Sequence, residues 1–131
     1  MFRAVKRPIL VVDDHEDNRE MVSALLVEHG LVVVQASNGK EALDLLLAAG
    51  EEEPFLILLD LEMPVMTGWE FLHVVRGHAR LSSIPVVITS GSHQMHEIAM
   101  RAPILAFVPK PANFALLLDV VRRAALQPPH P

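Results

Sequence analysis

Five short apolar runs alternate along the chain with segments in which apolar residues recur at helical spacing. Continuous apolar runs rich in β-branched residues are typical of strands buried on both faces of a parallel sheet. The alternation therefore predicts a doubly wound α/β domain in which helices connect parallel strands. The expected strands are 9–12, 31–36, 55–59, 86–89 and 105–108. The expected helices are 18–28, 40–49, 69–76, 94–101 and one that Asn113 caps and that runs to about residue 126.

The length and composition predict a single domain over residues 1–131, with a packed core of about 8–126 and a proline-rich, flexible tail at 127–131. The formal net charge is −5 and no basic block occurs, which argues against a nucleic-acid partner. No apolar run approaches the roughly 20 residues that a membrane span needs, and the first residues are too charged for a signal peptide. Cysteine is absent. We therefore expect a cytoplasmic protein with no membrane association.

Polar residues follow three of the expected strands. Asp13 and Asp14 come after 9–12, Asp60 comes after 55–59, and Lys110 follows the fifth run. Because the carboxyl ends of parallel strands meet at one edge, where open α/β folds bind their ligands, we expect these side chains to converge. Mg²⁺ takes oxygen ligands, usually including one or two carboxylates, and leaves room for water and phosphate. The pattern predicts a site where a metal ion and a phosphoryl group meet.

Each of these residues has a simpler interpretation when it is considered alone. One aspartate of the pair could cap the first helix, Asp60 could cap a turn, and Lys110 could be an ordinary surface lysine. Together they favour a cation site, because carboxylates packed at the end of a sheet repel one another unless a cation compensates. Asp60 is then the candidate nucleophile, since a carboxylate can attack phosphorus and form an acyl phosphate. Lys110 is a compact charge suited to pairing with a phosphate.

Two further strand ends carry weaker signals. Thr89 and Ser90 end the fourth expected strand, and either hydroxyl could donate a hydrogen bond to a phosphoryl oxygen. Phe107 lies inside the fifth expected strand, where a core position is its simplest interpretation. Pro111 biases Lys110 away from helical geometry, which fits a turn at the end of that strand.

Four short motifs stand in a fixed order, at 9–14, 58–68, 85–91 and 108–111, and a fifth at 38–43 fits the start of a second helix. In this order and spacing they resemble the receiver domain of two-component response regulators, especially the single-domain chemotaxis and sporulation phosphorelay regulators. The resemblance covers about 8–126. It implies a flavodoxin-like, five-stranded parallel sheet of order 2-1-3-4-5 with five helices.

The resemblance also implies a function. The aspartate at the position of Asp60 would accept a phosphoryl group from a phosphohistidine on a sensor histidine kinase or a histidine phosphotransfer protein. The side chains of Asp13, Asp14 and Asp60 and the backbone carbonyl of Glu62 would hold Mg²⁺, with Asp14 the more direct ligand of the adjacent pair. Lys110 would pair with the phosphoryl oxygens.

By the same resemblance, Ser90 matches the switch hydroxyl and Phe107 the aromatic switch position, whereas Thr89 falls one residue early. Ser90 would move toward the new phosphoryl group, and Phe107 would turn inward to fill the space. The change would reach the surface of the fourth helix, fifth strand and fifth helix. A downstream protein target or, after phosphorylation, a second copy of the chain would bind there.

The chain departs from the family pattern in three places. Glu62 adds a carboxylate two residues after Asp60, so we expect altered phosphorylation or dephosphorylation kinetics. The segment between the fourth and fifth strands is short, and Pro103 truncates its helix. Phenylalanine at 107 lacks a tyrosine hydroxyl, so an output contact through this side chain would be apolar.

Three functions fit these features. The first is a stand-alone phospho-receiver, with no room for an output domain, whose own activity is limited to self-phosphorylation and autodephosphorylation. The second is a constitutive interaction module that keeps the fold without being phosphorylated; the complete set of site residues argues against it. The third is a metal-dependent phosphatase with Asp60 as nucleophile and Glu62 as its paired carboxylate. A chain of this length leaves little sequence for the substrate cap that such an enzyme needs.

Overall fold

The structure, a computed structural model, describes residues 6–63, 65–91, 104–110 and 113–126. Within these ranges five parallel strands form one sheet of order β2-β1-β3-β4-β5. The strands are β1 (Ile9–Val12), β2 (Val33–Ala36), β3 (Leu56–Asp60), β4 (Val86–Ser90) and β5 (Ala106–Pro109). The helices are α1 (Glu16–Glu28), α2 (Gly39–Ala49), α3 (Gly68–Arg76) and α5 (Phe114–Ala125), with short 3₁₀ segments η1 (Gly50–Glu52) and η2 (Leu81–Ser83).

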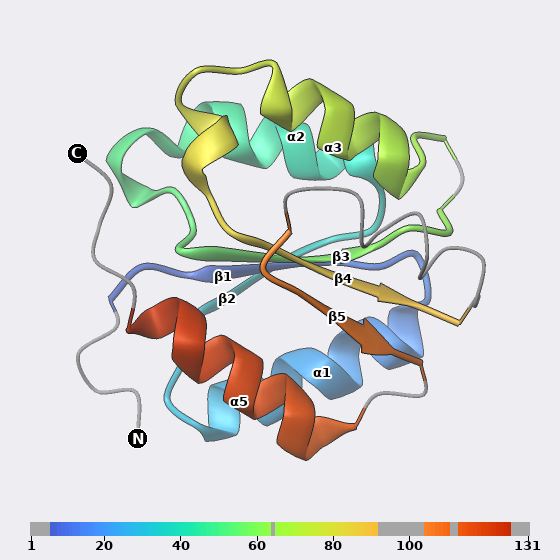
Figure 1. Cartoon of the computed structure of the whole chain (residues 1–131), viewed down its shortest axis with the longest axis vertical. Coiled ribbons are helices and arrows are strands. Elements are labelled where there is room, and N and C mark those ends of the chain that lie inside the picture. Colours follow the sequence, from blue (N-terminus) through green and yellow to red (C-terminus); the bar gives the residue numbers. More distant parts are fainter. Residues whose placement is uncertain (1–5, 64, 92–103, 111–112, 127–131) are drawn as a thin grey trace.

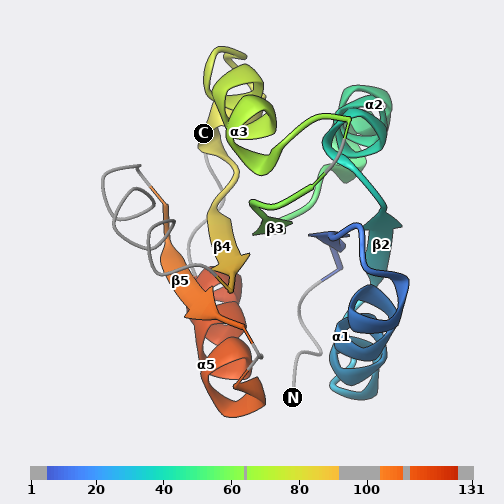
Figure 2. The same ribbon diagram turned by 90° about the vertical axis from the view of Figure 1, so that its right-hand side faces the viewer.

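The sheet is sandwiched between two layers of helices. Helices α2 and α3 cover one face, and α1 and α5 cover the other (Figures 1 and 2). Alternate residues of each central strand enter the two apolar cores. In β1, for example, Leu10 and Val12 pack on the α2/α3 side, and Ile9 and Val11 pack on the α1/α5 side. Burial on both faces explains why β1 and β3 are continuous apolar runs in the sequence.

The expected fold is confirmed, with small shifts at the ends of elements. Strand β2 begins at Val33 rather than at residue 31, because the chain first folds back on the end of α1. There Gly30 has a φ of 89°, and the Leu31 N–H donates to the Leu26 carbonyl at 3.1 Å. This left-handed glycine with a returning hydrogen bond is a common way to end a helix.

Asp60 is the last residue of β3 rather than the first residue after it, since it pairs in register with Thr89 of β4. The α1 helix begins at Glu16, two residues before its expected start. Asn113 caps α5 as expected, accepting a hydrogen bond from the Leu116 N–H at 3.1 Å. The expected helix at 94–101 and the tail at 127–131 lie outside the described residues, so the described part holds four of the five expected α-helices.

The register of the sheet brings the carboxyl ends of four strands to one edge. Val12 of β1 pairs with Leu59 of β3, and Ser90 of β4 pairs with Pro109 of β5. The residues that follow these pairs lie side by side although they are far apart in the sequence. Among the described helices, none combines the length and apolar character required to cross a membrane.

Candidate functional site

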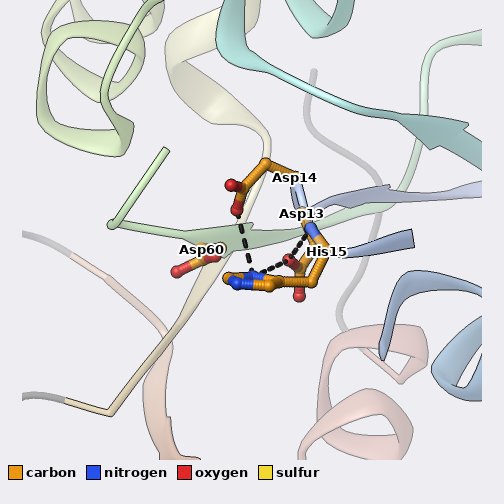
Figure 3. A group of neighbouring side chains, drawn as sticks. All are labelled: Asp13, Asp14, His15 and Asp60. Carbon is orange, nitrogen blue, oxygen red and sulfur yellow. Dashed lines mark hydrogen bonds and ion pairs between the residues drawn. The ribbon is translucent and has the colours of Figure 1, made fainter. Parts of the chain in front are cut away.

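Three aspartates gather at the carboxyl edge of the sheet. Asp13 and Asp14 follow β1, and Asp60 ends β3. Together with His15, each offers a ligand atom within 4.8 Å of the others (Figure 3). Asp13 and Asp60 are buried, with 3% and 1% of their surface exposed. The expected convergence of carboxylates is thus present in the structure, and His15 is an additional member that the sequence reasoning did not identify.

The ammonium group of Lys110 bridges two of these carboxylates. Its Nζ atom lies 3.1 Å from Oδ2 of Asp60 and 3.3 Å from Oδ2 of Asp13. The backbone of Lys110 is fixed by its own N–H, which donates to the carbonyl of Ser90 at 3.0 Å. Burial alone would lower the pKa of Lys110, but the charges of Asp60 and Asp13 outweigh it and raise the pKa, so the ammonium stays charged at neutral pH.

The first turn of α1 folds around Asp13. The Asp13 carboxylate accepts hydrogen bonds from the backbone N–H of His15 at 2.9 Å and from the side-chain amide of Asn18. The Arg19 guanidinium donates to the carbonyl of Asp13 at 2.9 Å. Burial raises the pKa of Asp13, but these hydrogen bonds and the charge of Lys110 together outweigh it and place the pKa below its usual value. Asp13 is therefore ionised at neutral pH.

The net shift of the pKa has the opposite direction at Asp60. Its Oδ1 atom accepts a hydrogen bond from the Glu62 N–H at 3.0 Å, and its Oδ2 atom contacts Lys110. Both interactions favour the carboxylate, yet the loss of solvent is the larger effect and raises the pKa of Asp60 from 3.8 to about 6. The charge of nearby Asp13 adds to the rise. At pH 7.5 most of Asp60 is still ionised, at a cost in folding free energy.

Ser90 and Glu62 are joined by a hydrogen bond. The hydroxyl of buried Ser90 donates to Oε1 of Glu62 at 3.3 Å. The carboxylate expected near the site therefore lies beside the residue expected to be the switch hydroxyl. Thr89 lines a small cavity on the α1/α5 side of the sheet together with Val11 and Leu58. Phe107 is half-buried and packs against the α2/α3 core, which agrees with the simple core interpretation.

Gly68, at the start of α3, allows the chain to pass close to Asp60. A Cβ atom on Gly68 would lie 2.6 Å from the carbonyl oxygen of Asp60 and 2.6 Å from Cα of Leu61. The Gly68 N–H donates to the Leu61 carbonyl at 3.1 Å, which ties the helix to the end of β3. In the sequence, Gly68 is the last residue of the motif at 58–68, and nothing there indicates this close approach.

The donor atoms of the cluster fit a hard divalent cation. Three carboxylates supply the oxygen ligands that Mg²⁺ requires. Oδ1 of Asp14 is inaccessible to solvent and accepts no hydrogen bond. Its neighbour at 3.2 Å is Nδ1 of His15. A buried carboxylate oxygen without a hydrogen bond is costly, and a bound cation would satisfy it. The arrangement can therefore hold a metal ion beside a carboxylate and an ammonium. These positive groups could stabilise the negative charge of a phosphoryl group bound there.

The family to which the chain belongs agrees with this geometry. A model of the response regulator receiver domain matches residues 9–122, so the chain belongs to that family. A response regulator receiver protein of Anaeromyxobacter is 33% identical over 87% of this chain. The sensor histidine kinase CheAY of Helicobacter pylori is 29% identical over 88% of it. The response regulator TrrA of Thermotoga maritima, solved in complex with Mg²⁺–BeF, is 27% identical, with a TM-score of 0.77 over 90% of this chain and 98% of that one.

The two curated relatives are longer proteins. The chain spans 47% of the length of the Anaeromyxobacter protein and 15% of that of CheAY. The matches therefore identify a receiver domain of two-component signalling and assign no activity of a whole protein to this chain.

Proposed function

We propose that this receiver domain accepts a phosphoryl group on Asp60 from a phosphohistidine of a sensor histidine kinase or a histidine phosphotransfer protein. The observation that carries the proposal is the bridge from Lys110 to Asp60 and Asp13 beside a buried Asp14 oxygen that makes no hydrogen bond. A kinase as phosphodonor is supported by the match to CheAY, which is named a sensor histidine kinase. The domain acts in the cytoplasm, where such donors present their phosphohistidines.

The chemistry is a transfer between two nucleophiles. A carboxylate oxygen of Asp60 forms the new O–P bond while the N–P bond to the donor imidazole breaks, and the electron pair stays on the imidazole nitrogen. Lys110 holds a positive charge next to the oxygen atoms on which negative charge gathers during transfer. The Glu62 N–H and the buried walls of the site orient the Asp60 carboxylate.

The same group of residues fits Mg²⁺, as the complex of TrrA supports. Asp13, Asp14 and Asp60 and the backbone carbonyl of Glu62 would hold it. When bound, the ion supplies positive charge that compensates the carboxylates and the incoming phosphoryl group.

Phosphorylation then changes the surface through Ser90 and Phe107. The Ser90 hydroxyl leaves Glu62 for a phosphoryl oxygen, and Phe107 turns inward from its half-buried position on β5. The altered surface includes β5, α5 and the expected fourth helix, which lies outside the described residues. It binds a downstream protein, a second phosphorylated copy of the chain, or the next histidine-containing protein of a relay.

The test is phosphorylation by acetyl phosphate, read by intact mass with and without Mg²⁺. We expect one phosphoryl adduct that needs Mg²⁺, is lost in Asp60→Asn and is retained in Asp119→Asn, a matched change at an exposed aspartate of α5. An adduct that persists in Asp60→Asn would place the acceptor elsewhere. Mg²⁺ binding without any adduct would favour the constitutive interaction module.

A further inference from the structure

The imidazole of His15 lies between two carboxylates of the acidic cluster. Its Nδ1 atom is 3.2 Å from Oδ1 of Asp14 and 3.4 Å from Oδ1 of Asp13 (Figure 3). The His15 side chain is 66% exposed, so the ring forms the solvent side of the cluster while this nitrogen faces inward. No cap hydrogen bond holds the side chain, although His15 is the N-cap of α1.

His15 and Lys110 lie on different sides of the same carboxylate. Lys110 contacts Oδ2 of Asp13, whereas the His15 nitrogen faces Oδ1. The Oδ1 atom of Asp14, next to His15, is the buried oxygen without a hydrogen bond. The imidazole thus stands beside the Asp14 oxygen that makes no hydrogen bond, and it does not compete with Lys110 for Oδ2 of Asp13.

The spacing of these atoms suits ligands of a single ion. Neighbouring ligands of an octahedral ion with bonds of about 2.1 Å are about 3 Å apart, close to the separations of the His15 nitrogen from the two aspartates. The backbone of His15 is already fixed, since its N–H donates to Asp13 and its carbonyl accepts from the Arg19 N–H at 2.9 Å. Only rotation of the side chain is needed to adjust the ring.

We propose that His15 is a nitrogen ligand of the metal site, so that the site binds late first-row divalent ions such as Co²⁺, Ni²⁺ and Zn²⁺ in competition with Mg²⁺. Imidazole suits these ions, whereas Mg²⁺ selects oxygen. The inference rests on the proposed function in one respect, because it uses the same carboxylates. The preference for these ions would depend on His15, the histidine that follows the aspartate pair.

The test is calorimetric titration of the full chain with Co²⁺ alone and with Mg²⁺ alone, in the wild type, in His15→Gln and in His73→Gln. His73 is an exposed histidine on α3 and serves as the matched control. We expect His15→Gln to lower the preference for Co²⁺ over Mg²⁺ by about tenfold or more, and His73→Gln to leave it unchanged. Using the ratio of the two Kd values removes general effects of the substitution on the fold.

Proton NMR gives a second readout. Co²⁺ is paramagnetic, and we expect it to displace the imidazole resonances that His15→Gln removes, whereas the same resonances should move little with Mg²⁺. An unchanged Kd ratio in His15→Gln would overturn the role of His15 and leave the proposed phosphoryl acceptor standing, provided that Mg²⁺ still binds. Failure of both ions to bind the wild type would overturn the metal site itself, and with it both proposals.

Discussion

The Nζ atom of Lys110 lies 3.1 Å from Oδ2 of Asp60. The same ammonium contacts Asp13, and Asp14 stands beside them, so three carboxylates share one lysine and one exposed histidine. The surplus of negative charge at a buried edge opposes folding, and a divalent cation or an additional positive charge would relieve it. We therefore expect that removing a carboxylate raises the stability of the metal-free domain and that removing the lysine lowers it.

Asp60→Asn should stabilise the metal-free domain at pH 8. The pKa of Asp60 is about 6 in the folded state against 3.8 ordinarily, so the folded state binds the proton more tightly than the unfolded state. The stability supplied by the protonated form is present below about pH 4 and is lost as the pH rises through about 6. We expect a gain of about 1–3 kcal/mol in the free energy of unfolding at pH 8.

The measurement is urea unfolding with EDTA, followed by the fluorescence of Trp69, which is the only tryptophan of the chain. The gain should shrink toward pH 4, where Asp60 is protonated in the folded wild type. A variant that is less stable than the wild type at pH 8, or a gain that does not depend on pH, would contradict the charge surplus.

Lys110→Met should destabilise the domain at the same pH. It leaves Asp13 and Asp60 without the ammonium that both contact, and removing one partner of a buried ion pair costs about 3–5 kcal/mol. Lys40→Met is the matched control, because Lys40 is exposed on α2 and forms an ion pair with exposed Asp44. Such a surface pair contributes less than about 1 kcal/mol. Equal losses from the two substitutions would show that Lys110 is an ordinary surface lysine.

Much of this site can be predicted from the sequence because its functional residues lie at the ends of strands. A parallel sheet brings the carboxyl ends of its strands together whatever their separation in the chain, so Asp13, Asp60 and Lys110 were expected to converge. The buried strands were readable for a similar reason, since β1 must be apolar on both faces. The strand order came from the family resemblance, because periodicity alone does not specify which strands are neighbours.

Other parts of the site depend on side-chain geometry that residue types do not specify. The inward turn of the His15 nitrogen, the amide of Asn18 on Asp13, and the contact of Ser90 with Glu62 each select one rotamer among several. Sequence does carry a signal for two of them, since His15 is adjacent to the aspartate pair and Asn18 falls in the first turn of α1. The tight passage of Gly68 over β3 depends on the angle of a loop.

Glu62→Gln should speed phosphorylation by acetyl phosphate. The substitution keeps an acceptor for the Ser90 hydroxyl and removes a negative charge two residues from Asp60. Because a like charge near the site repels an anionic phosphodonor, we expect an increase of about 3- to 10-fold in the rate of adduct formation. Asp44→Asn, an exposed charge on α2, controls for net charge. Identical rates in Glu62→Gln and the wild type would show that the charge of Glu62 does not affect the rate of phosphorylation.

Gly68→Ala should destabilise the end of β3. Its Cβ atom would meet the Asp60 carbonyl at 2.6 Å, so α3 or the strand must shift, at a cost of about 1–3 kcal/mol. Gly77→Ala, at the other end of α3, is the matched control. Gly77 has a φ of −78°, and a Cβ atom there would lie 3.6 Å from its nearest neighbour. Thermal unfolding that ranks the two variants equally would contradict the close approach at Gly68.

The central claim is that Asp60, Lys110 and the aspartate pair form one metal and phosphoryl site. A crystal structure of the chain with Mg²⁺ and beryllofluoride, a mimic of the acyl phosphate, tests it most directly. We predict beryllium bonded to a carboxylate oxygen of Asp60, a fluorine in contact with Nζ of Lys110, and Mg²⁺ on oxygens of Asp13 and Asp14. Beryllofluoride bound elsewhere, or a metal ion remote from Asp60 and Lys110, would contradict the account.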